Sequence, residues 1–165
     1  MTNRLPLGFA SFDQFNLFCR ELVLAVAAEG ARAEAWIIGT AATGFSMHPE
    51  KPGRAFSKTS DINVVLRSLE LMQKMKEAGG QADTSWNFQG KHLWLRNDGP
   101  NGFLSACPHV AAFATKWSSL LPVPVDIRLF IGVRGLMTHV DQFLELQDPI
   151  ELWPQSIYAS EGGSS

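Results

Sequence analysis

The chain has 165 residues, of which 45% are hydrophobic and 18% are charged, and its formal net charge is −2 at pH 7. This length suits one domain, which would bury about 70% of the surface that its unfolded chain exposes. Ordinary apolar content and low net charge exclude disorder as the main state. Because 14 basic residues face 16 acidic ones and no long basic run occurs, binding of duplex DNA through bulk electrostatics is excluded as well.

Neither a membrane nor an oxidising compartment is indicated by the sequence. The N-terminus has no long apolar run after Arg4, and the most apolar stretch falls far short of the ~20 residues that span a bilayer. Two cysteines, Cys19 and Cys107, are too few for a disulfide scaffold. We therefore expect a cytoplasmic protein without a membrane partner, with a single domain over residues 1–159 and a flexible tail over residues 160–165.

The first predicted element is a helix that begins after Ser11. Ser11 is a favourable N-cap, and Gln14 follows three residues later, as in a capping box. Apolar residues then recur at spacings of three and four until the helix ends near residues 29–30. This spacing predicts one apolar face, which consists of Phe12, Phe15, Cys19, Leu22 and Val26.

A short apolar run over residues 35–38 is closed by Gly39 and predicts a buried strand. Residues 40–60 are rich in Gly, Pro, Ser and Thr and have no clear periodicity beyond one helical turn at their start. They predict a long loop, and loops of this length in small domains are usually functional or mobile. Residues 61–67 then alternate between polar and β-branched or apolar side chains, which predicts a strand with Ile62, Val64 and Leu66 on one face.

The second half of the chain predicts two further helices, a strand and a final helix. Ser68 caps a helix that stops at Gly79-Gly80, and Pro108 begins another that ends before Pro122. Between them, residues 81–106 show no clear pattern except a candidate short strand at 92–96.

Residues 125–131 are the clearest strand, and a last helix is expected at about 139–146. The order of elements predicts an α/β fold with a mixed β-sheet and helices packed on it.

Polar side chains on two of the predicted strands form a candidate binding site. Asp61 and Asn63 are two residues apart on one strand, so both point to the same face. Asp126 lies on the strand at 125–131, on the face opposite Val125. If the two strands are neighbours, three oxygen-bearing side chains converge, and such groups hold hard divalent cations. The alternative is structural, with carboxylates at strand ends that accept hydrogen bonds from loop N–H groups.

Two segments of the chain resemble a known family. They are Gly39-Thr-Ala-Ala-Thr-Gly-Phe-Ser46 and Phe56-Ser-Lys-Thr-Ser-Asp-Ile-Asn-Val-Val-Leu66. Together they resemble the core of nucleotidyltransferase-like proteins of the polymerase-β superfamily, in which a glycine and a small hydroxyl residue precede a short helix and a strand that begins Ser-Asp-x-Asp. The segment at residues 124–130 looks like the last core strand of a bacterial subgroup found as domains of polymorphic toxins. The close match covers about residues 36–68 and 122–131.

The resemblance implies a role for each matching residue. Gly39 and Thr40 match the phosphate-binding turn, Asp61 matches the first metal-binding aspartate, and Asp126 falls where a third acidic residue is expected. Asn63 stands in place of the second aspartate, where it offers one neutral carbonyl oxygen but removes a negative charge. Two carboxylates and one amide are compatible with one Mg²⁺ (or Mn²⁺), and they put a full two-metal mechanism in doubt.

Three further residues near this segment are candidates for nucleotide binding. Lys58 could neutralise phosphate charge, although a solvated loop lysine is the simpler interpretation. Ser46 and Ser60 could contact phosphate, but both residues also favour turns.

We therefore expect a metal-dependent nucleotidyltransferase that uses an NTP as donor and modifies a hydroxyl of an RNA, such as a tRNA, or of a protein. A toxin or defence role is implied by the subgroup resemblance alone. The alternative is a catalytically inactive nucleotidyltransferase-like protein that serves as a binding or interaction module, and Asn63 is the residue that favours it.

Overall fold

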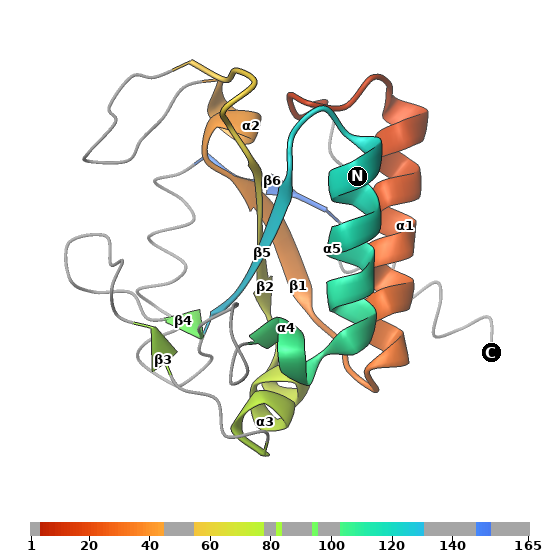
Figure 1. Cartoon of the computed structure of the whole chain (residues 1–165), viewed down its shortest axis with the longest axis vertical. Helices are drawn as coiled ribbons and strands as arrows, with labels where there is room; N and C mark the ends of the chain where they lie inside the picture. The colour runs from red at the N-terminus through yellow and green to blue at the C-terminus, as the bar shows by residue number, and fades with distance from the viewer. Residues whose placement is uncertain are drawn as a thin grey trace.

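The computed structural model describes residues 4–44, 55–77, 82–83, 94–95, 103–130 and 148–152. Figure 1 shows a central sheet with the two longest helices side by side against one of its faces, a short helix near one end of the strands and another helix near the other end. The described elements are α1 (Phe12–Ala28), β1 (Glu34–Ile38), α2 (Thr40–Thr43), β2 (Ile62–Arg67), α3 (Leu69–Glu77), β3 (Ala82–Asp83), β4 (Trp94–Leu95), α4 (Phe103–Ala106), α5 (Pro108–Leu120), β5 (Val125–Phe130) and β6 (Ile150–Glu151).

The sheet is mixed, as the sequence predicts. The described strands lie in the order β3-β4-β5-β2-β1-β6. β2 is central, because it pairs antiparallel with β1 on one side and parallel with β5 on the other. The predicted strands at 35–38, 61–67 and 125–131 correspond to β1, β2 and β5; the first was located by its short apolar run and the other two by alternation and β-branching.

Helix α1 begins and ends as predicted. The Ser11 hydroxyl accepts a hydrogen bond from the Gln14 N–H (3.1 Å), and the Gln14 side chain accepts one from the Ala10 N–H (2.8 Å). This is a capping box whose return bond reaches one residue further back than usual. At the other end Glu29 is the C-cap, and Gly30 adopts a positive φ of 76°, which glycine allows at low cost.

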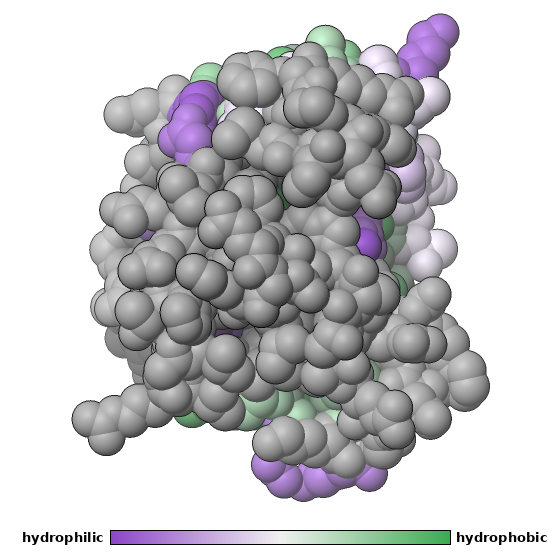
Figure 2. Space-filling view, turned by 90° about the vertical axis from the view of Figure 1, so that its left-hand side faces the viewer, coloured by the Kyte–Doolittle hydropathy of each residue, from purple (hydrophilic) through white to green (hydrophobic). Residues whose placement is uncertain are grey.

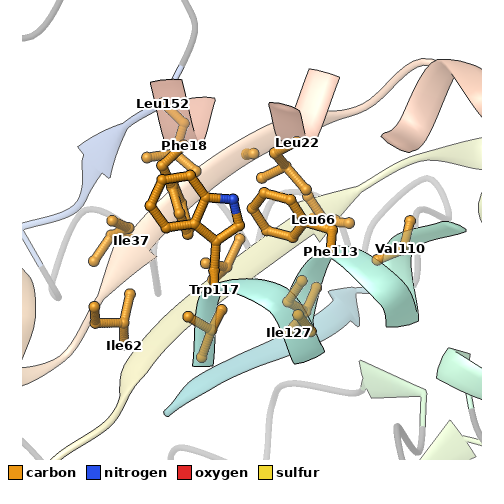
Figure 3. Close-up of a cluster of buried hydrophobic side chains, with 14 of the residues drawn as sticks. Phe18, Leu22, Ile37, Ile62, Leu66, Val110, Phe113, Trp117, Ile127 and Leu152 are labelled. Atoms are coloured by element: carbon orange, nitrogen blue, oxygen red, sulfur yellow. The ribbon is translucent and has the colours of Figure 1, made fainter. Parts of the chain in front are cut away.

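The hydrophobic core lies between the sheet and the pair α1 and α5. Figure 3 shows side chains from both helices meeting side chains from β1, β2 and β5. Phe18 is fully buried, and its ring centroid lies 4.9 Å from that of Phe113 and 5.2 Å from that of Trp117. The predicted apolar face of α1 is only partly right, because Phe12 is 45% exposed whereas Phe18 is buried. The core face of β2 is as predicted, and it consists of Ile62, Val64 and Leu66.

Helix α3 lies at the far end of the strands from α2. The Ser68 hydroxyl accepts a hydrogen bond from the Leu71 N–H (3.2 Å), which is the predicted cap. Figure 2 shows a hydrophilic patch at the lower end of the molecule with hydrophobic atoms beside it. On α3 the side chains of Glu70, Gln73 and Glu77 are exposed, as is that of Leu69. No helix within the described ranges is long and apolar enough to cross a membrane.

Some sequence predictions fall on segments that the structure does not describe. The predicted helix at about 139–146 and the predicted tail at 160–165 both lie outside the described residues. The short elements α4, β3 and β6 were not predicted, since elements of two to four residues leave almost no periodicity in the sequence.

Candidate functional site

Asp61 and Asn63 lie together where β2 begins. Asp61 immediately precedes the strand, and the Asn63 side-chain N–H donates a hydrogen bond of 3.0 Å to Asp61 Oδ1. The two side chains therefore share one face of the sheet, as their spacing predicts. This face is opposite the one that packs against α1 and α5, because Ile62 and Val64 occupy the core.

The parallel pairing of β2 with β5 brings Asp126 to the same place. Asn63 and Asp126 are direct register partners, and the Ile62 N–H donates to the Pro124 carbonyl (2.9 Å) where the pairing begins. The condition set by the sequence analysis, that the two strands be neighbours, is met. Asp126 is half-buried, with 24% of its side chain exposed.

Arg128 is a site residue that the sequence analysis did not single out. Its Nε donates to Asp126 Oδ2 at 3.0 Å, and 31% of its side chain is exposed. The signal was present, because residues two apart on a strand share a face and Arg128 follows Asp126 at that spacing. The site thus holds two carboxylates, one amide and one guanidinium.

Gly39 borders this group from the end of β1. Ile38 pairs with Asn63, and Gly39 then turns the chain into α2 with a φ of 76°. A Cβ at Gly39 would stand 3.4 Å from the Asn63 Nδ2, so glycine allows both the left-handed backbone and the close approach to the amide. Thr40 follows as the first residue of α2 and is half-buried.

The other predicted nucleotide-binding residues are less informative. Ser60 closes a turn before β2, since its hydroxyl accepts a hydrogen bond from the Ser57 N–H (2.9 Å). Lys58 is exposed in the same turn, and Ser46 lies outside the described residues. The turn-forming role considered for Ser60 is therefore observed, while phosphate contacts by the three residues stay predictions.

The electrostatics of the site centre on Asp61. Burial raises the pKa of the Asp61 carboxyl above its usual value, and the nearby charge of Asp126 raises it further. The hydrogen bond from Asn63 and the charge of Arg128 act in the opposite direction without cancelling the rise. The ionised form of Asp61 is therefore held at a cost in free energy, which a cation bound beside it would reduce.

Replacing Asp61 with asparagine is expected to raise the melting temperature at pH 7 by a few degrees. The folded state holds the Asp61 proton more tightly than the unfolded chain, so the stability of the wild type falls as the pH rises above about 3.8, the ordinary value. Asparagine removes that charge and can still accept the hydrogen bond from Asn63. Thermal unfolding of both proteins between pH 3 and pH 8 measures the effect, which should vanish at the acidic end.

Asp148→Asn is the matched control for this comparison. Asp148 is an exposed carboxylate that pairs with Arg4 at the surface, and its loss should change stability by no more than about 0.5 kcal/mol. A melting temperature of Asp61→Asn below that of the wild type at pH 7 would contradict the electrostatic account.

The oxygen donors of the site are of the kind that magnesium prefers. Mg²⁺ prefers oxygen ligands and is commonly bound through one or two carboxylates together with substrate phosphates. Asp61 and Asp126 supply two carboxylates, and Arg128 offsets one of their negative charges. Within the described part of the chain, no group of three or more His, Cys, Asp or Glu side chains is placed to hold a metal ion.

We compared the chain with protein families, curated proteins and solved structures. No family model, no curated protein and no solved structure matches the chain. The structure defines the protein as an α/β protein with a mixed sheet.

Proposed function

We propose that this protein binds a nucleoside triphosphate with one Mg²⁺ at the adjoining ends of β1, β2 and β5 and transfers its nucleotidyl group to a hydroxyl of an RNA or a protein. The observation that carries the proposal is the convergence of Asp61, Asn63 and Asp126 beside Gly39. Asp61, Asp126 and Gly39 are positions at which the sequence resembles nucleotidyltransferase-like proteins, and Asn63 stands where those proteins have a second aspartate. The parallel pairing of the two aspartate-bearing strands is what the proposal requires.

Each residue has a stated part in this proposal. Asp61 and Asp126 would hold the ion, with the Asn63 carbonyl assisting, and Gly39 would let a phosphate approach the backbone closely. A bound Mg²⁺ would neutralise triphosphate charge and lower the pKa of the acceptor hydroxyl. In the transfer, the acceptor hydroxyl releases its proton to solvent, its oxygen forms a bond to the α-phosphorus, and the bond to pyrophosphate breaks, so that pyrophosphate leaves. The contribution of the protein is positioning and charge stabilisation.

Isothermal titration with ATP, GTP, CTP and UTP, each with and without Mg²⁺, tests the proposal. One nucleotide should bind in a Mg²⁺-dependent manner, and Asp61→Asn should weaken that binding at least about tenfold, which corresponds to about 1.4 kcal/mol. The matched control is Glu34→Gln. Glu34 is a carboxylate on the same sheet that pairs with Arg67. It lies at the opposite end of β1 and β2 from Asp61. Absence of binding for all four nucleotides at millimolar concentration would refute the proposal.

A second candidate function is a catalytically inactive nucleotidyltransferase-like binding module. The observation that favours it is the hydrogen bond from Asn63 to Asp61. This bond gives one oxygen of the Asp61 carboxylate a partner inside the protein, so that oxygen does not need a metal ion. The variant Asn63→Asp separates the two functions. In a working one-metal enzyme it should lower transfer of a labelled nucleotide. In an inactive module the wild type transfers nothing, and the variant gains affinity for Mg²⁺.

A further inference from the structure

Arg128 places a fixed positive charge inside the proposed metal and nucleotide site. It lies two residues after Asp126 on the same face of β5, and its Nε is 3.0 Å from Asp126 Oδ2. Its charge also acts on Asp61, where it opposes the rise in the pKa that burial and Asp126 cause. One guanidinium therefore attracts both carboxylates of the site.

The partial burial of Arg128 strengthens this effect. With 31% of the Arg128 side chain and 24% of the Asp126 side chain exposed, the pair is screened by water less than a surface ion pair would be. Arginine stays protonated at any physiological pH and presents planar N–H donors that match phosphate oxygens. A permanent cation of this kind repels a divalent ion and attracts a polyphosphate.

The residue at position 63 changes the charge in the same direction. An aspartate there would add a negative charge between Asp61 and Asp126, because Asn63 is bonded to the first and paired in register with the second. With asparagine, the described residues of the site carry two negative charges and one built-in positive charge. This balance suits one divalent cation together with an anionic ligand.

We propose that Arg128 supplies, as part of the protein, the positive charge that a second divalent cation would otherwise bring, so that the site takes one Mg²⁺ and positions the triphosphate through the guanidinium of Arg128. The identity of the anionic ligand rests on the proposed function, whereas the effect of Arg128 on metal binding does not. Arg128 is in this sense a positioning residue that sets the number of metal ions.

Titration with Mn²⁺ alone, followed by the electron paramagnetic resonance signal of the free ion, tests the metal part. The wild type should bind at most one Mn²⁺ per chain. Arg128→Gln should bind Mn²⁺ at least about tenfold more tightly or take up a second ion, because the competing cation is gone. Arg128→Lys keeps the charge and should stay within about threefold of the wild type.

Arg67→Gln is the matched control, because Arg67 pairs with Glu34 on the same sheet and lies over the Trp36 ring at the opposite end of β2. It should leave Mn²⁺ binding unchanged. Unchanged or weaker Mn²⁺ binding in Arg128→Gln would overturn the inference, as would an equal gain in Arg128→Lys.

Nucleotide titration of the same variants separates this inference from the proposed function. Arg128→Gln should lose at least about tenfold in affinity for the nucleotide while it gains affinity for Mn²⁺, whereas a merely structural role would weaken both. If the wild type binds no nucleotide but Arg128→Gln gains a Mn²⁺ site, the proposed function fails and the metal part of the inference stands. If Arg128→Gln does not fold, the number of Mn²⁺ ions bound by the wild type with a saturating non-hydrolysable NTP decides, since two ions would overturn the inference.

Discussion

Replacing Glu29 with alanine is expected to lower the free energy of unfolding by about 2–4 kcal/mol, the cost of leaving two backbone N–H groups at a helix start and a partly exposed lysine without their acceptor. The Glu29 side chain is fully buried at the end of α1 and pairs with Lys74 of α3. Its other oxygen accepts hydrogen bonds from the first free N–H groups of α5, those of His109 (2.7 Å) and Val110 (3.3 Å). Alanine would leave these three donors without their acceptor. Urea unfolding followed by circular dichroism measures the loss.

Two further variants divide this effect into its parts. Glu29→Gln keeps an oxygen for the α5 N–H groups and removes the charge opposite Lys74, so it should cost less than Glu29→Ala. Glu77→Ala, at an exposed position of α3, is the surface control and should change stability by no more than about 0.5 kcal/mol. A Glu29→Ala protein as stable as Glu77→Ala would show that the three helices are not held together through this carboxylate.

Phe18→Ala is expected to destabilise the fold by about 3–5 kcal/mol, as large-to-small changes of buried aromatic residues do. Phe18 has no exposed surface, and its ring contacts Phe9, Phe113 and Trp117 at centroid distances of 5.0, 4.9 and 5.2 Å. Alanine would remove the side chain that α1 places between the rings of α5 and the N-terminal segment, and would leave a cavity. Chemical denaturation with a two-state fit measures the change.

Phe12→Ala is the matched control, because it makes the same substitution on the same helix at a position that is 45% exposed. It should cost under about 1 kcal/mol, since most of the transfer free energy of a phenylalanine comes from full burial. Equal losses in the two variants would show that α1 is rotated relative to the face assigned here.

The local parts of the fold could be predicted because their causes are local. Ser11 and Gln14 define the start of α1 through bonds within four residues, and the alternation in β2 fixes which side chains reach the core. Phe12 was assigned to the buried face because spacing alone cannot say how far the neighbouring elements extend over a helix end. Phe18 was missed although it fits the same spacing, three residues after Phe15 and four before Leu22.

The site could be predicted only in halves. Asp61 and Asn63 were placed together by their spacing, but their meeting with Asp126 depended on the pairing of two strands that are about 60 residues apart in the chain. Arg128 was overlooked because its role arises from the charges around it and not from a motif. The contacts of Glu29 with Lys74 and His109 had no sequence signal, because they join residues of three helices.

The long separation between β2 and β5 has a consequence for how the chain folds. β5 covers one edge of β2, and Val64, Val65 and Leu66 of that strand have no exposed surface in the finished sheet. During synthesis, β1 and β2 are complete well before residue 125 has been added. Until then, the edge of β2 that later pairs with β5 is unpaired and strongly apolar. Such an edge can pair with another chain, which makes the interval before β5 docks the stage most prone to aggregation. The strand that completes the aspartate pair thus also covers the apolar edge of β2.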